Sequence, residues 1–135
     1  MSTSGVAGYS GTPLPQKLGL KPGQVVYVDG GPDHVGELVG GTPYTTRLPR
    51  RIDVTLLFTT SRSRLEKRLL VVIERTVPAG MIWVCWPKKA SKVSTDVDEN
   101  AVREIALAAG VVDVKVAAVD AIWSGLKLVR RLRDR

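Results

Sequence analysis

The chain has 135 residues, 44% of them hydrophobic and 24% charged, with a formal net charge of +7 and one cysteine. This length fits one domain that can bury a core of its own, and no apolar run approaches the about 20 residues of a membrane-spanning helix. The first residues lack the basic and apolar regions of a secretory signal, and Cys85 has no second cysteine to pair with. These features argue against a membrane protein and against a protein stabilised by intramolecular disulfides, and they favour a cytoplasmic protein. We expect a single domain over 1–135, with 1–11 as a flexible arm.

Short helices and strands are expected to alternate in the first half of the chain. The expected elements are a helix over 12–18, a strand over 24–29, a short helix over 34–39, at most a short strand within 42–51, and a strand over 54–59. Thr12 and Pro13 suit the N-cap and the first position of the first helix.

The strongest helical pattern starts at Ser61 or Ser63 and runs to about Val77. Its apolar residues recur at the spacing of one helical face. They are Leu65, Leu69, Val72, Ile73 and Thr76. Pro78 and Gly80 then end the helix, because proline lacks an N–H and glycine favours a turn.

A run of apolar residues, Met81–Trp86, predicts a central strand covered on both faces. Pro87 ends it, since proline cannot donate to a strand ladder. A polar loop follows, and Thr95 or Asp96 can cap the next helix, which is expected over 97–109.

Two alternating apolar runs, over 112–118 and 126–132, predict half-buried strands near the end of the chain. They form an antiparallel hairpin through residues 120–125, with Ser124-Gly125 as its natural turn. Because the earlier strands alternate with helices, we expect right-handed parallel crossovers between them. The sequence therefore predicts an α/β fold with a mostly parallel sheet and a C-terminal antiparallel hairpin. The loops that leave the parallel strands then share one edge, where ligands bind in such sheets.

The loop after Trp86 contains the main site candidates. Lys88, Lys89 and Ser91 precede a helix N-terminus, where backbone N–H groups and the helix dipole favour anions. A plainer interpretation is that Asp98 completes a Thr-x-x-Asp capping pattern and that the lysines are solvated. Tryptophan suits a pocket rim as well as a core. The candidate ligand-binding residues are Gly30, Gly31, Trp86, Lys88, Lys89, Ser91, Trp123 and Ser124.

No residue pattern points to a catalytic centre or a metal site. His34 is the only histidine, no G-x-S-x-G motif accompanies it, and we interpret it as an exposed loop residue. One cysteine and one histidine cannot supply the four ligands of a structural zinc site. Cys85 fits a small buried hydrophobe. Asp29, Asp53 and Asp120 lie near predicted strand ends.

Several segments resemble known families. LKPGQVVYVDGGP is similar to the strand-then-glycine motif that holds S-adenosylmethionine in Rossmann-type methyltransferases, and RTVPAGMIWV is similar to their later helix, Pro-Gly-Gly and strand segment. More closely, GYSGTPL, WPKKAS and WSGLKLV resemble a small bacterial family named only as domain of unknown function 3052. The resemblance implies a three-layer, methyltransferase-like Rossmann sheet that ends in a hairpin. The family name implies no activity.

The chain departs from the methyltransferase pattern at the positions that bind the cofactor in those enzymes. Asp29 matches the usual acidic position only after a one-residue shift, and Gly30, Gly31 and Gly36 lack the G-x-G-x-G spacing. Between residues 40 and 51 no acidic residue is present to hold the ribose hydroxyls. The segment 31–53 must also replace a longer βαβα passage. We therefore expect a reduced methyltransferase-like sheet that carries no cofactor.

The expected function is that of a non-catalytic binding or interaction domain. Its ligand would be anionic or nucleotide-like and would bind at the carboxyl ends of the parallel strands. One alternative is an S-adenosylmethionine-dependent methyltransferase with a degenerate motif. Another is a nucleic-acid or protein partner bound through the basic tail, Arg130–Arg135; the aromatic residues lie mostly in predicted strands, away from the arginines, which argues against single-stranded nucleic acid. A monomer and a homodimer both remain open.

Overall fold

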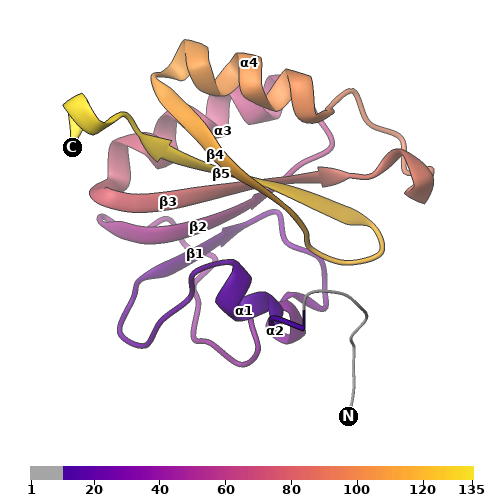
Figure 1. The fold of residues 1–135 in the computed structure, drawn as a ribbon, viewed down its shortest axis with the longest axis horizontal. Helices are drawn as coiled ribbons and strands as arrows, with labels where there is room; N and C mark the ends of the chain where they lie inside the picture. The colour runs from indigo at the N-terminus through magenta and orange to yellow at the C-terminus, as the bar shows by residue number, and fades with distance from the viewer. Residues whose placement is uncertain (1–10) are drawn as a thin grey trace.

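The computed structural model describes residues 11–135, so the expected arm lies, except for Gly11, outside the described residues. Its centre is one mixed sheet in the order β1-β2-β3-β5-β4 (Figure 1). The strands are β1 (Val26–Asp29), β2 (Ile52–Phe58), β3 (Thr76–Pro87), β4 (Val111–Ala118) and β5 (Trp123–Arg130). β1, β2 and β3 are parallel, and β5 runs antiparallel to both β3 and β4. The predicted parallel sheet with a closing hairpin is confirmed.

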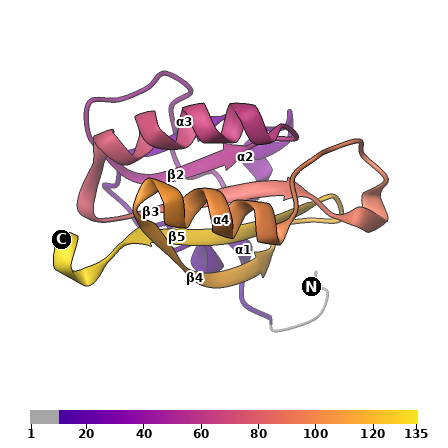
Figure 2. The same cartoon turned by 90° about the horizontal axis from the view of Figure 1, so that it is seen from above.

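Helices cover both faces of the sheet, as Figures 1 and 2 show. Two long helices, α3 (Arg62–Arg75) and α4 (Glu99–Ala109), lie on one face. The opposite layer is thinner and consists of the one-turn helices α1 (Leu14–Lys17) and α2 (Val35–Leu38). Short 3₁₀ turns form at Lys89–Ser91 (η2) and Leu132–Asp134 (η3). The predicted three layers are present. Within residues 11–135 the longest helix, α3, has 14 residues, and no helix combines the length and apolarity needed to cross a bilayer.

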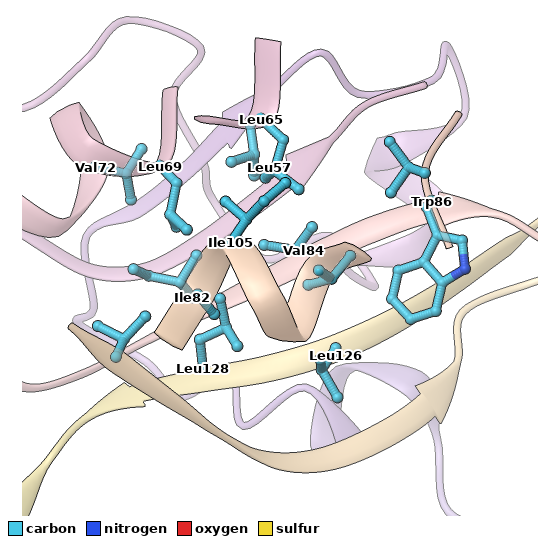
Figure 3. Packing of buried hydrophobic residues seen from close by; sticks show 14 of the residues in the cluster. Leu57, Leu65, Leu69, Val72, Ile82, Val84, Trp86, Ile105, Leu126 and Leu128 are labelled. Carbon is cyan, nitrogen blue, oxygen red and sulfur yellow. The ribbon is translucent and has the colours of Figure 1, made fainter. Parts of the chain in front are cut away.

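The larger core cluster lies between the sheet and the long helices (Figure 3). Leu65, Leu69 and Val72 project from one face of α3 at the predicted helical spacing, and each is fully buried. They pack with Leu57 of β2 and with side chains of β3, α4 and β5. Burial of this stripe, more than intrinsic helix propensity, stabilises α3.

A second core cluster fills the opposite face of the sheet. Its centre is Trp83, which is fully buried and whose indole N–H donates to the carbonyl oxygen of Leu18 at 2.9 Å. Gly125 lies beneath the ring, where a Cβ would stand 3.2 Å from Trp83 Cε3. Cys85 and Phe58 belong to the same cluster. The hydrogen bond ties the end of α1 to the middle of the sheet and satisfies a buried donor.

The boundary between α3 and β3 differs from the prediction. The helix ends at Arg75, and β3 already begins at Thr76. Pro78 and Gly80 therefore lie inside β3, at an irregularity where the register with β2 shifts. A Cβ on Gly80 would lie 2.6 Å from Thr76 Cγ2, so this crowded bulge needs glycine.

Two predicted helix caps were wrong. Pro13, not Thr12, is the N-cap residue of α1. Asp98, not Thr95 or Asp96, caps α4, since its Oδ1 accepts the backbone N–H of Ala101 at 2.8 Å. Ser61 is the correct N-cap of α3 and accepts the N–H of Arg64.

The hairpin turn was also misplaced. Ser124 and Gly125 lie within β5, where they pair with Trp86 and Cys85 of β3. The connection between β4 and β5 consists of residues 119–122. At its other end β5 stops at Arg130, and Leu132 lies beyond the strand with 80% of its surface exposed.

β1 is an edge strand of the sheet. In the connection from β1 to β2, Thr45 forms an isolated parallel bridge with Tyr27 of β1. Thr45 accepts the N–H of Val28 and donates its own N–H to Val26, each at 2.9 Å. This bridge is the short strand expected within 42–51, reduced to one residue.

Candidate functional site

The carboxyl ends of the parallel strands lie along one edge of the sheet. Asp29 ends β1, Phe58 ends β2 and Pro87 ends β3, and the parallel register places these ends side by side. The loops that follow bring together residues far apart in the sequence. They form two polar clusters and one groove.

The first cluster surrounds Asp29, whose side chain is only 8% exposed. Arg68 Nε donates to Asp29 Oδ2 at 2.7 Å, and Arg68 Nη2 donates to the hydroxyl of Tyr27 at 2.8 Å. Arg64 donates to the other carboxylate oxygen of Asp29 and to the carbonyl of Phe58. Burial by itself would raise the pKa of Asp29, but hydrogen bonds from Arg68 and Arg64 outweigh it and lower the pKa. The carboxylate is therefore ionised and neutralised by two guanidinium groups.

The glycine turn after Asp29 is packed tightly against this cluster. Gly30 has a φ of +69°, and a Cβ there would lie 2.6 Å from the carbonyl oxygen of Phe58. A Cβ on Gly31 would lie 2.6 Å from Val28 Cγ1. Both glycines are exposed to solvent on their outer side. Their lack of a side chain is thus required by the chain's own packing.

The second cluster joins His34, Asp120 and Lys88. His34 Nε2 lies 2.7 Å from Asp120 Oδ2, and Lys88 Nζ donates to the carbonyl oxygen of Asp120 at 2.7 Å. Asp120 Oδ1 also accepts the backbone N–H groups of Ile122 and Trp123 at the hairpin turn. Burial would raise the pKa of Asp120, but the Trp123 N–H, the His34 side chain and the Ile122 N–H lower it.

Sequence reasoning missed this second cluster. His34 was interpreted as an exposed loop residue, and Asp120 was noted only for its position near a strand end. The two residues are 86 positions apart, so no local spacing could pair them. The signal that was available is that His34 follows the glycine turn after the strand predicted over 24–29, and that Asp120 follows the strand predicted over 112–118.

A groove of about 870 Å³ lies beside the N-terminus of α4. It is lined by Trp86, Pro87, Lys89, residues 92–100 and Ser124. Its lysines, Lys89 and Lys92, face Asp96, Asp98 and Glu99, so the acidic groups outnumber the basic ones. Ser91 donates to the carbonyl of Lys88 at 2.6 Å and closes the η2 turn. This arrangement supports the plainer interpretation of a capped helix with solvated lysines, except that Asp98 itself, and not Thr95, is the cap.

The candidate residues from the sequence do not line one pocket. Trp86 belongs to the core cluster beneath α3 and α4 (Figure 3). It also borders the groove. Trp123 packs on the opposite face, edge-on to Phe58 with ring centroids 5.1 Å apart. Lys88 points to the hairpin rather than to the N-terminus of α4. Trp86 and Trp123 therefore do not flank one pocket, and both pack in or against a core cluster, the alternative that the sequence left open for tryptophan.

Two further residues have structural roles. Asp53 lies at the start of β2, where its carboxylate accepts the N–H of Val25 at 2.7 Å. Cys85 is buried, and burial raises the pKa of its thiol, so it behaves as the predicted small hydrophobe. Among residues 11–135 no cluster of His, Cys, Asp and Glu side chains is arranged to hold a metal ion.

The sheet order, the parallel strands and the closing hairpin define a methyltransferase-like Rossmann fold, and solved structures agree. A ribosomal protein L11 methylase from Lactobacillus delbrueckii subsp. bulgaricus has a TM-score of 0.60 at 7% identity, over 87% of this chain and 74% of that one. Magnesium protoporphyrin IX methyltransferase from Synechocystis PCC 6803, with bound SAM, has 0.57 at 13%, over 82% and 71%. Mitomycin 7-O-methyltransferase has 0.58 at 12%, over 87% and 53%.

No family model and no curated protein matches the chain. The resemblance to domain of unknown function 3052 thus stays a prediction. At these low identities the structural likeness shows the fold alone.

Several of the similar structures contain S-adenosylmethionine or SAH, and the charges at the glycine turn bear on that cofactor. Both oxygens of Asp29 already accept from arginines, so the cofactor's ammonium group would share this carboxylate with Arg64 and Arg68. The cofactor's sulfonium and ammonium charges would meet two guanidinium groups of the same sign, whereas its carboxylate would meet groups of the opposite sign.

Proposed function

We propose that this chain is a non-catalytic binding domain built on a methyltransferase-like fold. Its ligand is a small anion, nucleotide-like or otherwise phosphorylated, bound at the carboxyl edge beside Gly30-Gly31. The observation that supports this most is the convergence of Arg64 and Arg68 on the single carboxylate of Asp29.

Charge at this edge favours an anion. Arg64 and Arg68 carry two positive charges against one negative charge, and their side chains are 40% and 31% exposed. A guanidinium group that bonds a carboxylate on one side keeps N–H donors free on the other, and its planar fork matches a phosphate group. The exposed glycine turn lets a ligand approach the backbone closely.

Thermal-shift and calorimetric titrations with inorganic phosphate, adenosine monophosphate and ribose 5-phosphate test the proposal. We expect saturable binding of at least one of the three probes. Binding should be lost when Arg64 and Arg68 are both changed to Gln. The matched control is Arg62→Gln, on the same helix, because Arg62 points to Glu104 instead. No response in the unaltered protein, or the same response in the double variant, would overturn the proposal.

The second candidate is a methyltransferase with an unusual cofactor site. The fold comparisons favour it, since several neighbours are methyltransferases. The pair of His34 and Asp120 favours it as well, because a histidine that is oriented by a carboxylate is suited to accept a proton from a substrate. Calorimetry with S-adenosylmethionine separates the candidates. Saturable binding would support the enzyme and contradict the like-charge argument above, whereas its absence excludes the enzyme.

A further inference from the structure

A cluster of arginines gathers at the opposite end of the sheet, where β2 and β3 begin. We call it the amino-end arginine cluster. It comprises Arg50 and Arg51 before β2, Arg75 at the end of α3, and Arg130, Arg131 and Arg133 at the end of the chain. None of these residues lies at the carboxyl edge, so this cluster is separate from the proposed ligand site.

Hydrogen bonds hold the three segments of the cluster together. Arg75 Nη1 donates to the carbonyl of Pro49 at 3.0 Å, which fixes the segment just before Arg50 against the end of α3. Arg130 Nη2 donates to the carbonyls of Ile73 and Thr76 at 2.6 and 2.8 Å. The tail is thereby attached to the junction of α3 and β3, and Figures 1 and 2 both show it beside that junction. Arg130 thereby satisfies the carbonyl of Ile73 in the last turn of α3, and Arg75 itself lies in that turn, where cations are favoured.

The remaining arginines of the cluster are exposed or half-exposed and largely uncompensated. Among the described residues, Arg50, Arg51 and Arg131 take part in no ion pair, and Arg133 meets only Asp134, at 3.9 Å. Every cation in the cluster is arginine, whose flat guanidinium group binds phosphate in a bidentate manner. An open surface with several such groups suits a ligand with several phosphates in a row.

The aromatic side chains narrow the class of ligand. Trp83 is buried in the core, and Trp86 and Trp123 lie at the carboxyl edge. Tyr27 and Phe58 are buried, so among the described residues Tyr44, in the connection from β1 to β2, is the one remaining aromatic side chain with an exposed surface. Single-stranded nucleic acids are usually held by stacking on aromatic rings. From this we infer that the amino-end arginine cluster binds the phosphate backbone of a nucleic-acid duplex, without reading its bases.

Fluorescence anisotropy with labelled DNA and RNA duplexes of arbitrary sequence tests this inference on the full chain. Affinity should fall as salt rises, with a log–log slope of about −4 if four free arginines each neutralise one phosphate. A single strand of the same length should bind more weakly. Binding that does not depend on salt would overturn the inference.

Two variants with equal net charge test whether the effect is local. Changing Arg50, Arg51, Arg131 and Arg133 to Gln should weaken duplex binding about tenfold or more at moderate salt. Changing four exposed lysines to Gln should leave it nearly unchanged; these are Lys21, Lys89, Lys92 and Lys115. Arg75 and Arg130 are left intact, because they bond to the backbone. An equal loss in both variants would show a general charge effect and overturn the inference.

Two double variants test whether both halves of the cluster contribute. Changing Arg50 with Arg51, or Arg131 with Arg133, to Gln should each remove part of the affinity for the duplex. A loss confined to the tail pair would contradict a surface composed of both segments.

Vesicles of anionic lipid test the exposed Leu132 as a membrane contact. Binding to vesicles with no binding to duplexes would overturn the inference in favour of a lipid surface.

Discussion

At the scale of single residues, the buried charge of Asp29 holds together the hydrogen-bond network at the carboxyl edge of the sheet. Its carboxylate is almost fully buried, and such a charge is tolerated only with strong partners. Arg64 and Arg68 supply them, and Tyr27 extends the network through its hydroxyl. A buried network of this kind fixes the end of β1 in one arrangement.

Asp29→Asn should destabilise the fold at neutral pH by about 1.5–3 kcal/mol, because hydrogen bonds to a charged group are lost. The pKa of Asp29 is lowered in the folded state. Its contribution to the free energy of unfolding is therefore present above the unfolded pKa of about 3.9 and is lost as the pH falls through the lower folded value. Urea unfolding of both proteins between pH 7 and pH 2 measures this. The difference should be constant down to about pH 4 and should close below it; a constant difference at all pH values would contradict the ion-pair account.

Cys85 should be inert in the native protein. It is buried in mid-strand, and burial raises the pKa of its thiol, so little thiolate forms and reagents cannot reach it. A thiol-reactive chromogenic disulfide should give no signal in buffer and one equivalent in denaturant. Prompt reaction in buffer would show that β3 is less protected than the structure indicates.

At the scale of elements, helix starts are set by single side chains. Asp98 caps α4 through the N–H of Ala101, and Ser61 caps α3 through the N–H of Arg64. The sequence left the start of α3 open between Ser61 and Ser63 and placed the cap of α4 too early, since Thr95, Asp96 and Asp98 are all good capping residues. In the structure Val97, which separates Asp96 from Asp98, is buried in the larger core cluster.

Asp98→Ala should cost about 0.5–2 kcal/mol of stability, the usual effect of removing an N-cap side chain. Asp98→Asn is the matched control and should be nearly neutral, because asparagine caps as well as aspartate. Thermal unfolding measured by circular dichroism compares the two variants. Equal losses in both would indicate that the charge of Asp98, rather than its cap, matters.

The end of α3 could not be predicted from pattern alone. Thr76 matches the helical face by spacing, and the prediction therefore continued to Val77. In the structure Thr76 pairs with Ile52 as the first residue of β3, while its hydroxyl donates to the carbonyl of Val72. Tertiary pairing thus outweighs a favourable local spacing at this position.

At the scale of the whole molecule, the topology was predictable and the site was not. Buried strands alternating with helices determined the parallel part, and period-two alternation determined the hairpin. The site depended on register: Pro87 pairs with Trp123, so Trp86 pairs with Ser124 instead. Because neighbouring residues of a strand face opposite sides, this offset of one residue puts the two tryptophans on different faces. The alternation of apolar and polar residues within each strand does not by itself reveal this register between strands.

Protection from hydrogen exchange should follow the layout of the sheet. The central strands β2, β3 and β5 are flanked on both sides and buried, so their amides should exchange only by global unfolding. Residues 30–51 have a single one-turn helix, α2, and a single bridge, and they should exchange by local opening. Exchange followed by mass spectrometry checks this order. Slow exchange throughout 30–51 would contradict it.

The three tryptophans differ in burial and therefore serve as intrinsic fluorescence probes. Trp83 is fully buried at mid-sheet, whereas Trp86 and the half-buried Trp123 lie near the edge where β3 ends. Iodide should therefore quench mainly Trp123. A small anion at that edge should alter this quenching, whereas a duplex at the far end should leave it unchanged. Iodide quenching of tryptophan fluorescence in the unlabelled protein can thus show at which end of the sheet a ligand binds.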